Sequence, residues 1–184
     1  MRGEAACFAS TLERTGRLVL HQLKNMPKAA LNWIVPFPEC HSLFDFATRL
    51  IETNEFWVQS VVGGQPVERD DLLVELYRDG ELAYLIARYE RWLLNLHDHL
   101  DDFPDTLMTM HVVLPTFYSQ ELGDGPITVR DCLLYAVEQS ALQSGRIQLM
   151  CQLYADFERL REELSNVHAD DGMLLEILNR EQLN

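Results

Sequence analysis

The chain has few basic residues and no long apolar run. Lys and Arg number 15 against 29 Asp and Glu, which gives a formal net charge of -14. Such a charge repels nucleic-acid phosphates and anionic lipid surfaces at long range. No apolar stretch approaches the roughly 18 residues that a membrane-spanning helix needs, and Glu4 and Glu13 interrupt any secretory signal at the N-terminus. We expect a cytoplasmic protein that binds neither nucleic acid nor membrane.

Cysteine is also scarce, and its spacing is uninformative for metal binding. The four cysteines include no CxxC pair. Cys132 and Cys151 fall inside a stretch with a helical pattern, where a small apolar side chain packs well. This distribution favours reduced structural thiols over a redox or metal site.

What the sequence does contain is helical periodicity. Its 184 residues, 47% of them hydrophobic, suffice for one domain with a proper core, so we assign residues 1–184 to a single domain. Apolar residues recur at three- to four-residue steps in four long segments, which predicts an all-α fold. These segments are residues 4–23, 42–62, 81–100 and 128–157.

Two of the four predicted helices carry clear start signals. Ser42 is followed three residues later by Asp45, and Thr128 by Asp131. This capping-box pattern satisfies the free backbone amides of a first helical turn. The pair Gly63-Gly64 predicts the end of the second helix.

Prolines and turn residues define the connections. The segment 24–41 contains three prolines, so we expect an extended, partly buried connector anchored by Trp33. A short helical passage is expected over 67–80. Between Pro104 and Pro126 the sequence predicts a long connection with an extended piece around Met110 to Leu114, of the kind that covers the mouth of a site. After an interruption at 166–171, residues 172–183 are expected to form a short final helix.

Two stretches resemble the DinB-like (YfiT-like) metalloenzyme family. LNWIVPFPECHSLFDFATRLIETNEFW, residues 31–57, is similar to the family's segment leading into and through helix two. VEQSALQSGRIQLM, residues 137–150, is similar to its HxxxHxG segment in helix four. The resemblance covers nearly the whole chain. It implies a four-helix bundle, a homodimer, and a divalent metal held by one histidine from helix two and two from helix four.

The three ligand positions do not carry histidine here. Aligned on Gly145, the helix-four positions are Gln139 and Gln143, and aligned on Trp57 the helix-two position is Arg49. A glutamine carbonyl is a weak neutral ligand, and a guanidinium keeps its charge and repels a cation. We therefore expect no metal and no cofactor at this site.

Arg49, Gln139 and Gln143 become the candidate ligand-binding residues. The guanidinium offers five N–H donors and the glutamines offer carbonyl acceptors, so the three side chains could satisfy one another in the core. Asp45 or Glu138 would supply the countercharge. Two interpretations stay open: the cluster fills the former metal cavity, or it forms a pocket for a carboxylate or other anionic ligand.

Other residues give weaker signals. His97 and His99 are two apart and face different sides of one helix, and among the histidines only His111, in the long connection, stays a candidate near the cavity. Three functional hypotheses follow. The first is a metal-free, small-ligand binding or accessory protein. The alternative is a thiol-dependent transferase or isomerase using bacillithiol, mycothiol or glutathione, as the resemblance implies. The third is an interaction module that uses its helix faces and acidic surface.

Overall fold

The computed structural model describes residues 3–35, 41–64, 82–113 and 125–181, with side chains as far as residue 165. In these ranges the protein is all-α, as predicted, with no strand and a single isolated bridge between His111 and Thr128. The elements are α1 (Glu4–Asn25), α2 (Lys28–Leu31), α3 (Leu43–Asn54), the π-helix η1 (Glu55–Val62), α5 (Leu82–Leu100), the 3-10 turn η2 (Asp105–Leu107) and α7 (Val129–Glu181).

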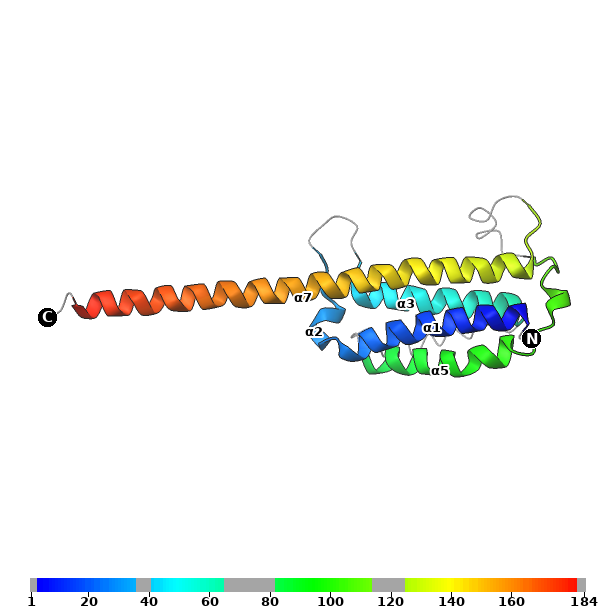
Figure 1. Ribbon diagram of the computed structural model, residues 1–184, viewed down its shortest axis with the longest axis horizontal. Coiled ribbons are helices and arrows are strands. Elements are labelled where there is room, and N and C mark those ends of the chain that lie inside the picture. The colour runs from blue at the N-terminus through cyan, green and yellow to red at the C-terminus, as the bar shows by residue number, and fades with distance from the viewer. Residues whose placement is uncertain (1–2, 36–40, 65–81, 114–124, 182–184) are drawn as a thin grey trace.

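The long helices lie side by side around one apolar core (Figure 1). Helix α1 packs against α5 and α7, while α3 and η1 pack against α7 and α5. We call this packed part, which includes α7 as far as Phe157, the helical body. Its largest fully buried side chains are Trp57, Trp92, Tyr89, Leu12, Leu23, Leu31, Leu43, Leu50, Ile51, Leu85, Leu96 and Leu100.

Both predicted capping boxes are confirmed. The Asp45 amide donates to Ser42 Oγ at 3.1 Å, and the Ser42 amide donates to the Asp45 carboxylate at 3.0 Å. At the start of α7, the Thr128 amide donates to Asp131 Oδ2 at 2.8 Å, and the Asp131 amide donates to Thr128 Oγ1 at 3.3 Å. The hydrogen bonds from Thr128 lower the pKa of Asp131. Reciprocal bonds of this kind fix where each helix begins.

The second long helix changes its winding in the middle. After Asn54 the α-helical α3 continues as η1, and the amide of Gly63 bonds back to the carbonyl of Val58 at 2.9 Å. Gly64, with a φ of 65°, follows in a conformation that suits glycine. The predicted helix end is confirmed, whereas the π-helical winding was not expected.

The connections agree with prediction only in part. The connector after α1 forms the short helix α2 where extended chain was expected. Trp33 is half-buried and packs against Tyr154 and Phe157 of α7, with ring centroids 5.6 and 5.7 Å apart. Residues 110–113 pair with the approach to α7, since the Val112 amide donates to the Ile127 carbonyl at 2.9 Å. The predicted passage 67–80 and Leu114 lie outside the described residues.

Helix α7 differs most from expectation. It runs without a break through 53 residues, so the predicted interruption at 166–171 and the separate helix at 172–183 are wrong as far as Glu181. Residues 129–181 contain no proline, and a single glycine such as Gly172 costs a helix only about 1 kcal/mol. The end of α7 projects far beyond the helical body (Figure 1). None of the described helices is both long and apolar enough to cross a membrane.

Candidate functional site

The structure places the three predicted site residues in different surroundings. Arg49 is exposed, Gln139 is half-buried and Gln143 is buried. Gln143 Oε1 accepts a long hydrogen bond of 3.5 Å from Arg146. No hydrogen bond or ion pair within the described chain joins Arg49 to either glutamine. The arrangement therefore differs from the expected buried cluster.

Helix geometry explains why Arg49 lies outside. The buried positions of α3 are Leu43, Ala47, Leu50, Ile51 and Asn54, which repeat at three- and four-residue steps. Arg49 precedes Asn54 by five residues, which turns it about 140° around an α-helix. Its charged group stays in water because burying an unpaired guanidinium is expensive.

A different polar group occupies the contact between α3 and α7. Ser140 Oγ donates a 2.7 Å hydrogen bond to Asn54 Oδ1, and both residues are at most 2% exposed. Gln143 and Ser144 follow Ser140 by three and four residues and are buried on the same face of α7. We call these four residues, Asn54, Ser140, Gln143 and Ser144, the polar seam.

The polar seam has an unused donor. Asn54 Nδ2 is buried and has no hydrogen-bond acceptor among the described residues. A buried polar group without a partner costs about 1–3 kcal/mol, and such groups are rare in native structures. An acceptor oxygen on a small molecule or a water would satisfy it. The seam is therefore suited to a neutral polar group rather than to a cation.

The π-helix η1 begins directly after Asn54. Its first residue, Glu55, forms a largely buried ion pair with Arg88 of α5, at 2.5 Å between Oε2 and Nη2. Burial lowers the pKa of Arg88, but the hydrogen bond and charge of Glu55 outweigh it, so the pKa is raised. π-Helical turns recur at functional sites. The position of η1 beside the seam is therefore a second indication of a site.

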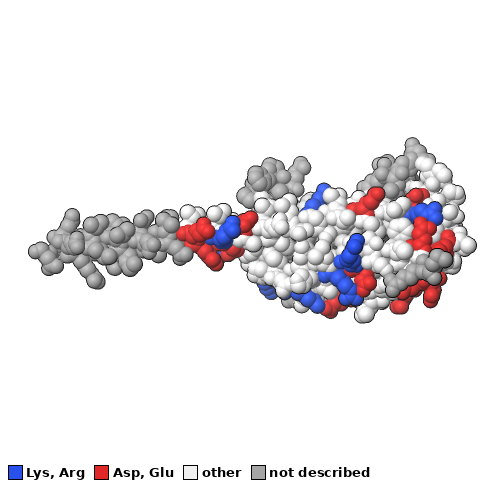
Figure 2. Space-filling model, in the orientation of Figure 1, with Lys and Arg blue, Asp and Glu red and all other residues white. Residues whose placement is uncertain are grey.

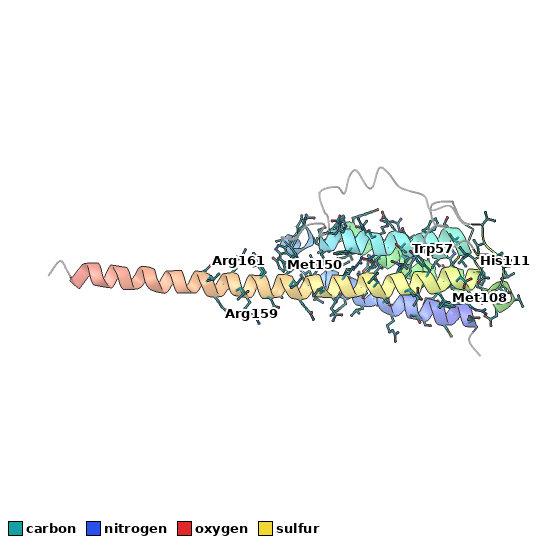
Figure 3. The ribbon with its side chains drawn as sticks, turned by 90° about the horizontal axis from the view of Figure 1, so that it is seen from above. Trp57, Met108, His111, Met150, Arg159 and Arg161 are labelled. Carbon is teal, nitrogen blue, oxygen red and sulfur yellow. The ribbon has the colours of Figure 1, made fainter. Side chains whose placement is uncertain are left out.

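Aromatic packing ties η1 to α7. The Trp57 ring meets Tyr135 edge-on at 5.0 Å between centroids and Phe56 at 5.1 Å. Figure 3 shows Trp57 between the two helices, toward the end of the body that His111 and Met108 mark and far from Met150. The ion pair and the ring contacts therefore hold the π-helical segment from both sides.

A shallow hollow of about 330 Å³ lies on the outer side of Tyr135. It is lined by Gly125, Pro126, Ile127, Asp131, Leu134, Tyr135 and Glu138. Its Asp131 carboxylate is already used to cap α7. The hollow is separate from the residues of the seam, and Tyr135 is the side chain that connects it to Trp57.

The histidines and cysteines do not assemble a metal site in the described part of the chain, where no three ligand-type side chains converge. His111 is exposed beside its bridge to Thr128. His97 bonds Asp101 at 2.9 Å and Glu13 at 3.1 Å, and these carboxylates raise its pKa. Burial raises the pKa of the Cys132 thiol to about 11, so it stays protonated at neutral pH.

Sequence reasoning missed Asn54, although the signal was present. Asn54 continues the apolar repeat of α3, and a polar residue at a core position requires a partner. Alignment on Trp57 selected Arg49 instead, because a resemblance fixes position along the chain but not the direction in which a side chain points.

Comparison with known proteins supports the fold and assigns no function. No known family's sequence model matches the chain, and no curated protein matches it. The crystal structure of a conserved protein from Enterococcus faecalis is similar, with a TM-score of 0.59 and 14% sequence identity. The match covers 83% of this chain and 98% of that one. At such low identity the likeness concerns the fold alone.

Proposed function

We propose that the protein is a metal-free DinB-like bundle that acts in the cytoplasm as a homodimeric small-ligand binding or accessory protein. The observation that supports this best is the buried Asn54–Ser140 pair with its unused Asn54 donor. It lies between the same two helices from which the resembling family supplies metal ligands. A hydrogen-bonding site for a small molecule takes the place of a metal site in this proposal.

The chemistry of the seam defines the class of ligand. Its four residues are neutral amides and hydroxyls, so an uncharged molecule with a carbonyl or amide oxygen fits better than a free anion. The exposed Arg49 would hold a carboxylate only at the surface, where water competes for the same hydrogen bonds. The proposed ligand therefore meets Asn54 and Gln143, and Arg49 takes no part.

The test is a nuclear magnetic resonance screen of small amides, lactams and carboxylates against the isotope-labelled protein. We expect amide shifts in residues 54–62 and 139–144 with an amide or lactam. An Asn54→Leu variant should lose this binding, and Arg49→Met, the matched control on the same helix, should keep it.

Three results would contradict this assignment. Loss of carboxylate binding in Arg49→Met would return the site to the guanidinium, and the absence of binding by any compound would remove the ligand site. A stoichiometric divalent metal in protein purified without chelators, lost in Gln143→Ala, would show that the site is a metal centre after all.

A further inference from the structure

The C-terminal part of α7 projects beyond the helical body (Figure 1). Among the side chains of α7 that the structure describes, the last buried ones are Met150 and Tyr154. In Figures 1 and 3 the helix then continues alone, and the labels of Arg159 and Arg161 lie beyond the body while that of Met150 lies within it. We call residues 158–181 the projecting segment. At 1.5 Å per residue it is about 36 Å long.

Exposed apolar side chains form a line along the outer surface of α7. They are Leu142, Leu149, Leu153, Phe157, Leu160 and Leu164, each between 37% and 61% exposed. At about 100° per residue, all six lie within about 80° of one another around the helix. We call this line the apolar stripe. Contiguous exposed apolar surface of this kind marks an interaction site in soluble proteins.

The spacing of the stripe identifies the geometry of its partner. From Leu153 the steps to Phe157, Leu160 and Leu164 are four, three and four residues, the alternation of a coiled coil. The amino-acid sequence continues this spacing at Val167, Leu174 and Leu178, with Asp171 as the one charged position. About four heptads are enough to define a coiled coil rather than an ordinary helix face. The partner is therefore another long helix.

Charges beside the stripe select a second copy of the same helix in parallel. Asp156 and Glu163 border one side of the stripe, and Arg161 borders the other. In a parallel pair, the residue at each g position faces the e position of the partner's next heptad, which brings Asp156 of one copy to Arg161 of the other. An antiparallel pair would bring the two acidic borders together. The charges beside the stripe are thus complementary between two copies when their helices run parallel.

The ion pairs that these residues form within one chain do not oppose such pairing between two copies. Arg161 bonds Glu158 at 2.6 Å and Arg159 bonds Asp156 at 2.9 Å, all within one turn of the helix. Arg159, Asp156 and Arg161 are mostly in water, where such pairs contribute little, and only Glu158 is partly covered. Figure 2 shows both charge signs at the base of the projecting segment, with uncharged surface beside them.

We propose that two copies of the protein join through the apolar stripe, and that their α7 helices form a parallel two-stranded coiled coil. The proposal gives an interface to the homodimer of the proposed function. It does not depend on the polar seam, which lies on the opposite, buried side of α7.

The first test measures mass in solution by light scattering and sedimentation. We expect twice the chain mass of 21.3 kDa at micromolar concentration. The Leu160→Asp/Leu164→Asp variant should raise the dimer dissociation constant roughly 100-fold or more, because two apolar contacts per helix are replaced by charges. Leu94→Asp is the matched control, since Leu94 is exposed on α5, and it should leave the dimer unchanged.

The second test concerns orientation. Arg161→Glu should weaken the dimer about tenfold by facing acid with acid, and adding Asp156→Arg should restore it. A monomeric wild-type protein would overturn the whole proposal. A dimer that survives the double Asp substitution would overturn the stripe as its interface and leave the homodimer standing. A protein that dimerises but binds no small molecule would support this inference and contradict the ligand site at the polar seam. A monomer that binds a small molecule would do the reverse.

Discussion

The helical body and the projecting segment are parts of the same helix-rich chain, yet they are stabilised differently. In the body, ion pairs join residues far apart in sequence, such as Lys24 with Glu90 and Glu4 with Arg130, around an apolar core. At the base of the projecting segment the ion pairs Arg159–Asp156 and Arg161–Glu158 stay within one turn. The body therefore has its own source of stability, whereas the exposed, local pairs of the segment contribute little.

The largest expected effect separates the two regions directly. Leu50 is buried and Leu164 is exposed. Leu50→Ala should cost about 2–5 kcal/mol of unfolding free energy, because it opens a cavity in the core. Leu164→Ala should change the unfolding of the body by less than about 0.5 kcal/mol and weaken self-association instead. Urea unfolding, followed by tryptophan fluorescence at low protein concentration, measures both; equal losses would erase the distinction.

A second comparison uses arginines. Arg88→Met leaves Glu55 largely buried without its partner, so we expect a loss of about 3 kcal/mol. Arg161→Met breaks an exposed pair and should cost under about 1 kcal/mol in the monomer. If the double variant Arg88→Met/Glu55→Gln recovers much of the lost stability, the penalty comes from the unpaired carboxylate. Thermal unfolding of the three variants is the measurement, and equal costs for both arginines would contradict the idea.

The prediction of the fold from sequence succeeded where local signals agree. Ser42 and Thr128 mark helix starts because each finds its acidic partner three residues on. The polar run at 166–171 suggested a break, but small losses of helix propensity do not stop a helix that lacks proline. The π-helical winding of η1 had no sequence signal, since its residues are ordinary helix formers and long-range contacts such as Glu55–Arg88 decide the local geometry.

Sequence reasoning gave the position of the candidate site along the chain but not the direction in which its side chains point. Gln143 is buried, as the predicted cluster requires, whereas Arg49 is exposed and Asn54, five residues further on, is buried. The apolar repeat of α3 contains the missing information, because it gives the direction of each side chain. The unused Asn54 donor required atomic positions, since only these reveal which of its atoms Ser140 satisfies.

A double variant of the polar seam should have a smaller effect on the stability of the body, and it should stabilise where the variants above destabilise. Asn54→Leu/Ser140→Ala removes both partners of the buried bond together with the unmatched Asn54 donor. We expect the pair of changes to stabilise the free protein by about 1 kcal/mol, because no polar atom of the pair is left unsatisfied. Ser140→Ala alone should destabilise it, since Asn54 loses its partner. Urea unfolding tests this, and a double variant weaker than both singles would mean that the seam contributes stability itself.

The smallest expected effect depends on pH and concerns the surface of the body. Asp101 first and Glu13 second raise the pKa of His97 above its ordinary 6.5. The folded state therefore favours protonated His97, so its contribution is complete below pH 6.5 and is lost as the pH rises through the higher folded pKa. Solvent screens this half-exposed group, so the contribution is under about 1 kcal/mol. His97→Gln should lower the melting temperature at about pH 6 and have little effect at about pH 9. A deficit that does not change with pH would show that the contacts of His97 act through packing and not through charge.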